Sequence, residues 1–518
     1  MAIVEFPREL NLSVEYVEKH VREGRGEDLA LVYRDESYTY REVLENVCKA
    51  AHLLRELGLE PEQRVLLMLG DHPEFVWFWF ATVRAGGIVS AVNPDAKPEE
   101  LAYYLDYTRS RLLVAEERIL GTAVQPEKAR WLKGVVACRG EGGPLPPKTV
   151  RWEERRAELP AAFEPEPTLA EDVCNMLYTG GSTGFPKAVV HRQVDFLYNT
   201  HTYGLPILGL KKGDVTVSAS RLFFGYALGT NLLFPFRAGA TVALFPEKPT
   251  PERILEEVTR RRATLLVSVP TVINAMVQFE PEPGRYDWSR LRITTSAGEA
   301  LPPALLERYQ QKYGHEVLDG IGSAELFHVY ITSRPGDVVP GSLGKVVEGY
   351  EAKVCDDDGR ELPDGELGSL WIRGESMGLG YFRRTADTRK HFRGEWFVSA
   401  DKFRRDAEGR FYYGGRTDDL LKVGGRFLAP TEVENCLLEH PAVQEVAVVG
   451  FTDAEGLTKP RAYVVVKPGV EASDALVREL QDFVKERLQP WKYPRQVIFM
   501  EALPKSDRGK ILRTALRD

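Results

Sequence analysis

Three glycines, three serine or threonine side chains and a lysine fall within the run 178–187, Tyr-Thr-Gly-Gly-Ser-Thr-Gly-Phe-Pro-Lys. Glycine lets the backbone approach a ligand closely, so successive N–H groups can surround phosphate oxygens together with the hydroxyl groups. Lys187 adds a positive charge. The run is not a Walker A loop, because Pro186 stands where that motif requires glycine before lysine. It predicts a phosphate-binding loop of another kind.

The run resembles the signature loop of the adenylate-forming superfamily, which contains acyl-CoA synthetases, luciferases and the adenylation domains of peptide synthetases. Loops of that superfamily usually read Thr-Ser-Gly-Ser-Thr-Gly-x-Pro-Lys, whereas this chain has Gly180 in place of the serine and Phe185 at the variable position. The resemblance implies ATP as a substrate, with Mg²⁺ between its phosphates. The loop residues that would bind ATP are Thr179, Gly180, Gly181, Ser182, Thr183, Gly184 and Lys187.

Three later segments, 296–302, 319–325 and 396–401, resemble the motifs that surround the adenylate, in the superfamily's order. The resemblance implies that Glu325 holds Mg²⁺, since a hard cation prefers carboxylate oxygen. Ala324 stands where the superfamily usually has threonine, which removes one hydroxyl contact to the α-phosphate. The other residues implied to bind the nucleotide are Gly298, Glu299, Ala300, Asp319, Gly320, Ile321, Gly322, Ser323, Asp401 and Arg416.

A hinge is predicted near residue 418, because segment 415–425 resembles the superfamily's hinge motif. We therefore divide the chain into an N-terminal AMP-binding domain with the acyl pocket, 1–417, and a mobile C-terminal domain, 418–518. The resemblance implies that Asp418 is the pivot. It also implies that Gly424 and Gly425 leave room for the thiol arm of coenzyme A.

Two lysines of the C-terminal region are catalytic by the same resemblance. Segment 503–511 resembles the superfamily's C-terminal motif, which implies that Lys510 bridges the substrate carboxylate and the α-phosphate. Lys422, four residues past the pivot, would contribute to the second half-reaction after the domain has turned.

The acid is predicted from segment 221–229, Arg-Leu-Phe-Phe-Gly-Tyr-Ala-Leu-Gly, and from 325–329, Glu-Leu-Phe-His-Val. The first lacks the acidic residue with which peptide-synthetase domains hold an α-amino group. Together the two segments most resemble the benzoate-CoA ligase branch, which implies adenylation of benzoate or a close analogue and transfer of the acyl group to coenzyme A. An aromatic wall and a polar cap suit a benzoate-sized ring. The implied pocket residues are Gly225, Tyr226, Ala297, Gly322, His328 and Val329.

Three alternatives remain open. Within the enzyme class, the chain could be a medium- or long-chain fatty acyl-CoA synthetase, or a stand-alone adenylating enzyme that loads a carrier protein. Outside it, the chain could be a nonenzymatic nucleotide-binding or scaffold protein, although the presence of Lys510, Glu325 and Asp401 speaks against this.

The helices and strands that must position these residues are indicated by the spacing of apolar residues, which alternates along the chain between helical and strand patterns. Apolar residues at helical spacing predict a helix over 40–57, which stops at Gly58. Short apolar runs of the kind buried in parallel sheets predict strands at 64–69, 88–92, 172–177, 241–245 and 264–269. This alternation is typical of doubly wound α/β sheets.

From about 340 to 415, short β-type runs between Asp-Gly turns predict a small antiparallel sheet or barrel. The region after 418 is predicted as α+β, with helices at 430–438 and 473–488 and strands at 445–449 and 462–466. The whole is an α/β fold: a large N-terminal domain of two doubly wound subdomains plus a small β-barrel, followed by a small α+β C-terminal domain on a hinge.

The composition sets wider bounds. A chain of 518 residues exceeds what one core usually serves, and its net charge of -8 argues against a nucleic-acid or anionic-membrane partner. No signal-peptide pattern opens the chain, and the longest apolar run, 75–80, is too short to span a membrane. Five scattered cysteines predict buried thiols in a reducing compartment. We expect a cytoplasmic enzyme of small molecules, with a homodimer as the working hypothesis for its oligomeric state.

Overall fold

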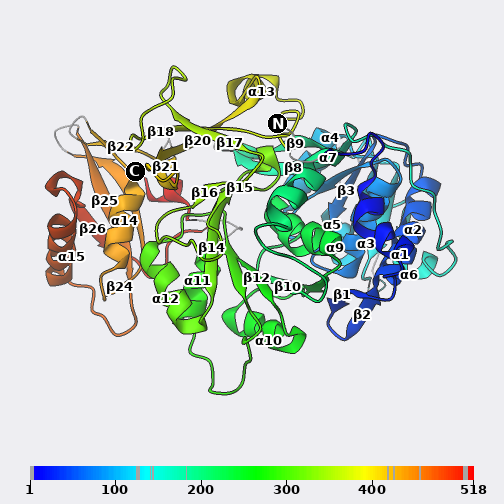
Figure 1. Ribbon diagram of the computed structural model, residues 1–518, viewed down its shortest axis with the longest axis horizontal. Helices are drawn as coiled ribbons and strands as arrows, with labels where there is room; N and C mark the ends of the chain where they lie inside the picture. Colours follow the sequence, from blue (N-terminus) through cyan, green and yellow to red (C-terminus); the bar gives the residue numbers. More distant parts are fainter. Residues whose placement is uncertain are drawn as a thin grey trace.

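The computed structural model describes residues 5–123, 129–140, 142, 145–181, 184–416, 419–423, 426–453, 457–505 and 511–517. Two α/β units lie side by side, a smaller sheet lies across the top, and an α+β unit lies at the far end of the molecule (Figure 1). No described helix is both long enough and apolar enough to cross a membrane. All five cysteines are buried and free, which confirms the prediction of buried thiols.

The first unit contains a seven-stranded sheet in the order β7-β6-β5-β3-β4-β8-β9, parallel except for β9. Its strands are β3 (Arg64–Met68), β4 (Ile88–Ala91), β5 (Leu112–Glu116), β6 (Gly134–Cys138), β7 (Thr149–Arg151), β8 (Val173–Gly181) and β9 (Gly184–Arg192). The main helices beside it are α2 (Tyr40–Glu56), α3 (Pro73–Arg84) and α4 (Pro98–Thr108). Helix α2 begins at Thr39 with a capping box to Glu42, close to the predicted start.

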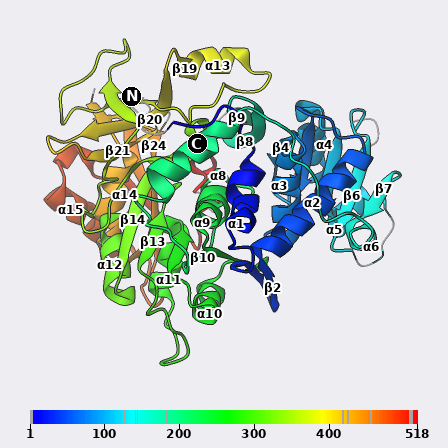
Figure 2. The same ribbon diagram turned by 45° about the vertical axis from the view of Figure 1, so that its right-hand side comes forward.

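The second unit contains a nine-stranded sheet in the order β16-β15-β14-β13-β12-β10-β11-β1-β2. Its strands are β1 (Leu29–Tyr33), β2 (Glu36–Thr39), β10 (Val215–Ser218), β11 (Thr241–Leu244), β12 (Leu265–Ser268), β13 (Ile293–Ser296), β14 (Glu316–Gly322), β15 (Val329–Thr332) and β16 (Lys345–Val346). The turned view in Figure 2 separates this sheet from the first one. Strands β10 to β14 are parallel, so the segments that follow them meet at one edge.

The smaller sheet is antiparallel, as predicted for 340–415. It contains β17 (Glu351–Cys355), β18 (Gly368–Arg373), β19 (Phe392–Arg393), β20 (Trp396–Arg405) and β21 (Phe411–Arg416). One continuous core runs from Leu67 of the first unit through Leu265 of the second to Phe403 of this sheet. The three parts therefore pack as one body.

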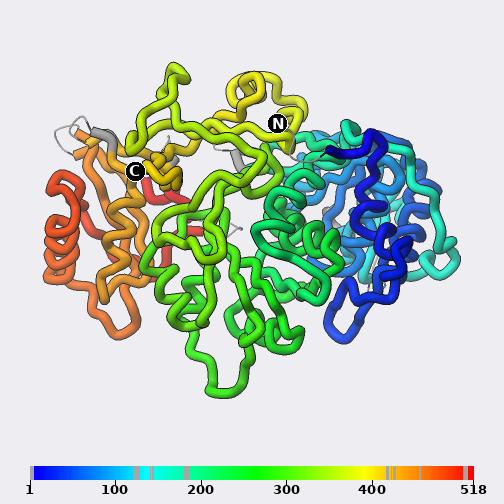
Figure 3. Tube along the Cα trace, viewed as in Figure 1, coloured from blue at the N-terminus to red at the C-terminus, as the bar shows by residue number. Residues whose placement is uncertain are grey.

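The C-terminal unit, orange to red in Figure 3, has a main core of its own within residues 421–499. It contains β22 (Leu421–Val423), β23 (Arg426–Leu428), α14 (Pro430–Leu438), β24 (Val443–Thr452), β25 (Thr458–Val466), α15 (Asp474–Arg487) and β26 (Gln496–Phe499). The predicted helices and strands of this region agree with these elements. The predicted mixed α/β fold, with a large N-terminal part and a small C-terminal part, is confirmed.

Candidate functional site

The glycine-rich run is the tip of a β-hairpin rather than a free loop. Strand β8 continues to Gly181 and β9 begins at Gly184, with Thr179 paired to Lys187. Segment 379–382 then pairs with the outer side of β9, where Leu379 N–H donates to the Val190 carbonyl at 2.9 Å. The hairpin is thus fixed on both sides. Ser182 and Thr183 lie outside the described residues.

Lys187 contacts a carboxylate and an aromatic ring. Its Nζ lies 3.0 Å from Asp387 Oδ1 and 5.2 Å from the centroid of the Tyr381 ring. Both partners lie on the segment that pairs with β9 or directly follows it. The lysine that was predicted from sequence to meet phosphate is therefore held at the hairpin by charge and by a cation–π contact.

Glu325, the predicted metal ligand, is buried and held at two points. The phenol of Tyr381 donates to Glu325 Oε1 at 2.7 Å, and the Gly378 N–H donates to the Glu325 carbonyl at 2.9 Å. Glu325 is only 5% exposed, so the Tyr381 bond rather than solvent directs its carboxylate, while the Gly378 bond holds its backbone. Tyr381 links Lys187 to Glu325, a role that sequence reasoning missed.

A buried histidine holds the residue before Glu325. His191 Nε2 lies 2.6 Å from the carbonyl of Ala324, and Nδ1 lies 2.9 Å from Asp195 Oδ2. A carbonyl can only accept, so Nε2 is the donor of the first bond. Both side chains are fully buried. The pair fixes the backbone at Ala324, where the chain lacks the superfamily's threonine.

Two of the predicted nucleotide-binding segments, 296–302 and 319–325, begin on neighbouring parallel strands of the second sheet. Ser296, the last residue of β13, pairs with Asp319 of β14. Burial raises the pKa of Asp319 to about 8, so this carboxyl is protonated at neutral pH. Within the described part of the chain, Asp319 Oδ1 and the hydroxyls of Ser296 and Ser323 have no hydrogen-bond partner. Buried polar atoms of this kind fit a polar ligand.

Asp401 lies on β20 opposite Arg416 of β21. Its carboxylate accepts from Ser399 Oγ at 3.2 Å and from the Tyr413 phenol at 3.4 Å. It also lies close enough to Tyr330 of β15 to raise the pKa of that phenol, although burial is the larger cause. The smaller sheet therefore brings a carboxylate to the edge that carries Ser323.

Tyr226 and His328, which were predicted to line the acyl pocket, lie together. The Tyr226 phenol, on α8 (Gly225–Leu228), donates to Thr295 Oγ1 at 2.7 Å, and the two aromatic rings stack with centroids 5.5 Å apart. His328 Nε2 lies 2.9 Å from the Tyr226 carbonyl and must donate to it. Burial lowers the pKa of His328 to about 4, so the ring is neutral at pH 7.

The glycines of this region are required by close packing. A Cβ on Gly322 would lie 2.4 Å from the His328 carbonyl oxygen, and one on Gly229 would lie 2.5 Å from the His328 ring. Ala297 and Val329 are buried beside them, at the ends of β13 and β15. Residues from the ends of β14 and β15, together with Gly229, thus lie close to His328.

The C-terminal site residues are not tested by the structure. Lys510, Asp418, Gly424 and Gly425 lie outside the described residues. Lys422 lies on β22 and Arg416 on β21, but only their backbones are described. Their roles stay predictions.

Two family models match the chain. The AMP-binding enzyme model covers residues 17–382, and the AMP-binding enzyme C-terminal domain model covers residues 432–510. This chain belongs to the AMP-binding enzyme family. The family resemblance of the sequence motifs is confirmed.

Individual members of the family resemble the chain over its whole length. A benzoate–CoA ligase of Thauera aromatica is 38% identical, with 99% of this chain and 97% of the relative covered. The crystal structure of the anthranilate CoA ligase AuaEII in complex with anthranoyl-AMP superimposes with a TM-score of 0.93 at 35% identity, covering 99% and 97%. A benzoate CoA ligase from Burkholderia xenovorans gives a TM-score of 0.89 at 35% identity, covering 98% and 100%.

Proposed function

We propose that this member of the AMP-binding enzyme family is an aryl-CoA ligase. It would join benzoate or a close analogue to the AMP part of ATP with release of pyrophosphate, and then transfer the acyl group to the thiol of coenzyme A with release of AMP. The observation that carries the proposal is the stacked pair of Tyr226 and His328 at the edge that holds the adenylate motifs. A flat, mostly apolar site with one polar group suits an aromatic ring. The names of the relatives, benzoate–CoA and anthranilate CoA ligases, support the same acid class.

The first half-reaction brings two anions together, the carboxylate and the α-phosphate of ATP. The glycine-rich run 178–187, with Lys187, would supply positive potential on one side, and Lys510 would supply it between the reacting groups. Asp401 would accept the ribose hydroxyls, and the partnerless atoms of Asp319, Ser296 and Ser323 would meet the adenosine part. Positioning and charge neutralisation dominate such a step.

The site fits Mg²⁺ at Glu325. The carboxylate is buried, and Tyr381 directs it from one side. Among the described residues no three His, Cys, Asp or Glu side chains gather as metal ligands. A single carboxylate suits Mg²⁺, which usually takes one or two carboxylates plus phosphate oxygens and water. When bound, the ion would neutralise charge on the phosphates of ATP.

The second half-reaction would follow a turn of residues 418–518 about Asp418. This turn would withdraw Lys510, and Gly424 and Gly425 would admit the pantetheine thiol of coenzyme A. Lys422 would then join the site. Hinge closure of this kind can limit turnover. We place the enzyme in the cytoplasm, with a homodimer as its oligomeric state to test.

Acid selectivity is the first test of the proposal. With ATP, Mg²⁺ and coenzyme A, kcat/KM for benzoate or a hydroxy- or aminobenzoate is expected to exceed that for octanoate or palmitate by about a hundredfold, since a ring-sized pocket excludes a long chain. The measurement is thiol consumption with each acid. Faster turnover of palmitate would contradict the aryl assignment. Adenylation without any thioester, when coenzyme A is the only acceptor, would favour the carrier-protein alternative.

The Tyr381→Phe variant is expected to weaken Mg²⁺ use selectively. Loss of the phenol bond frees the Glu325 carboxylate, and a hydrogen bond to a charged group is worth about 1.5–3 kcal/mol. The Mg²⁺ concentration for half-maximal pyrophosphate exchange should rise by about tenfold. The KM for the acid should stay within about twofold. Tyr412→Phe is a matched control, because that phenol donates to Asp406, on the hairpin turn between β20 and β21.

A further inference from the structure

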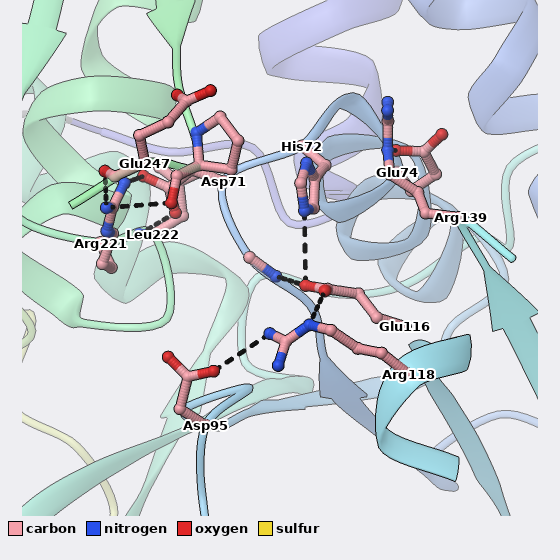
Figure 4. Close-up of polar contacts among 12 residues, drawn as sticks. Asp71, His72, Glu74, Asp95, Glu116, Arg118, Arg139, Arg221, Leu222 and Glu247 are labelled. Carbon is pink, nitrogen blue, oxygen red and sulfur yellow. Dashed lines mark hydrogen bonds and ion pairs between the residues drawn. The ribbon is translucent and has the colours of Figure 1, made fainter. Parts of the chain in front are cut away.

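A buried carboxylate of the first unit reaches the acyl-pocket segment of the second. Asp71 follows β3 and is 3% exposed. Its Oδ1 accepts the Leu222 N–H at 3.0 Å, and its Oδ2 lies 3.7 Å from the guanidinium of Arg221 (Figure 4). These partners begin the segment 221–229 that ends in the pocket. Burial raises the pKa of Asp71, and the facing guanidinium opposes that rise.

Arg221 also connects the start of segment 221–229 to the residues that follow β11. Its guanidinium donates to the Phe245 carbonyl at 2.6 Å and to the carbonyls of Pro246 and Glu247, just after β11. The planar fork of arginine can hold several acceptors at once. The Arg221 guanidinium therefore links the end of β11 to the start of segment 221–229 and also lies next to Asp71.

The residues on both sides of Asp71 are held by polar contacts. The next residue, His72, places Nδ1 3.0 Å from the Tyr33 phenol and Nε2 3.4 Å from Glu116 Oε1. The preceding Gly70 donates its N–H to the same Glu116 oxygen at 2.7 Å. Figure 4 shows His72 and Arg118 both directed at Glu116. Because both flanking residues are held, the position of Asp71 is set by Glu116 at the end of β5 in the first sheet and by Tyr33 of β1 in the second.

The segment held by Asp71 leads directly to the pocket. After Leu222, the Phe224 N–H donates to the Arg221 carbonyl at 3.0 Å, which closes a turn. Phe224 then starts α8, whose second residue is Tyr226. Phe223 and Phe224 also line a small cavity against Asn93 and Tyr178 of the first unit. A shift at Leu222 would therefore be passed along this turn to α8 and to Tyr226.

We infer that Asp71 is a positioning residue for acid recognition: from the first unit it fixes the start of segment 221–229 and thereby places Tyr226 in the acyl pocket. The inference rests on the proposed aryl-CoA ligase activity. Asp71 acts through its contacts with Leu222 and Arg221.

The test compares KM values in pyrophosphate exchange. Asp71→Ala is expected to raise KM for benzoate by about tenfold or more, since small misplacements in a site are costly, and to leave KM for ATP within about twofold. Asp71→Asn keeps an oxygen for the Leu222 N–H but loses the charge that faces Arg221, so an intermediate rise of about threefold is expected. If the alanine variant does not fold, the asparagine variant carries the test alone.

Glu74→Ala is the matched control. Glu74 is also buried, lies three residues further along, and pairs with Arg139 at 2.8 Å instead of with the acyl segment. It should lower the melting temperature without changing the KM ratio. If Asp71→Ala or, where that variant does not fold, Asp71→Asn leaves KM for benzoate unchanged, or if both KM values rise equally in the Asp71 and Glu74 variants, the positioning role is overturned. Wild-type protein that activates neither benzoate nor a hydroxy- or aminobenzoate contradicts the proposed function instead; the KM comparison is then made with the acid it prefers.

Discussion

Replacing Lys510 by alanine is expected to abolish formation of the acyl-adenylate while leaving the second half-reaction nearly intact. The lysine would stand between the carboxylate and the α-phosphate, where charge develops as the two anions join. Loss of one such electrostatic contact typically costs a factor of about a hundred to a thousand in rate. Acid-dependent exchange of labelled pyrophosphate into ATP measures the first half-reaction. Conversion of supplied benzoyl-adenylate with coenzyme A measures the second.

Lys505→Ala is the control for this experiment. Lys505 lies in the same C-terminal segment, but it pairs with Glu445 at 2.9 Å within the C-terminal unit. Its loss should leave both half-reactions within about twofold, as is usual for a partly exposed ion pair. Equal loss of both half-reactions in Lys510→Ala would remove the proposed role, because a residue that turns away with the domain cannot serve both steps.

The fold could be predicted wherever the determining pattern is local. The apolar spacing of 40–57 and the short apolar runs gave α2 and the parallel strands, because a helix face or a buried strand is encoded in a few consecutive residues. Strand β1 could not be placed, since its neighbour β11 lies some two hundred residues later in the chain. The glycine-rich run was predicted as a loop, yet its pairing of Thr179 with Lys187 makes it a hairpin. Glycine content indicates conformational freedom and not whether neighbouring residues pair.

The candidate site, too, could be predicted only in part from the sequence. The pairing of Ser296 with Asp319 and the stacking of Tyr226 on His328 bring together motif residues that were predicted to share a ligand. The supporting residues Tyr381, His191 and Asp71 were missed. Each acts on a partner more than fifty residues away, through one side-chain bond that no local pattern reports. The Gly-Leu-Gly-Tyr run that ends at residue 381 was the one available signal, since its glycines permit the close pairing with β9.

Replacing Tyr226 by alanine is expected to raise KM for benzoate by about ten- to a hundredfold, which corresponds to about 1.4–2.8 kcal/mol of lost ring contact. KM for ATP should stay within about twofold. Tyr226 lies on α8, whereas the β8–β9 hairpin, which is proposed to bind the phosphates, belongs to the seven-stranded sheet. The measurement is again pyrophosphate exchange, with benzoate and ATP varied in turn.

Tyr226→Phe separates the ring from its hydroxyl. Phenylalanine keeps the stacking surface against His328 but leaves the Thr295 hydroxyl without the 2.7 Å bond. A neutral hydrogen bond contributes about 0.5–1.5 kcal/mol, so KM for benzoate should rise only about two- to tenfold. The His328 bond to the Tyr226 carbonyl involves the backbone and survives in both variants. If the two variants are equally impaired, Tyr226 acts mainly through Thr295 on β13; if neither changes KM for benzoate, Tyr226 is not part of the acid site.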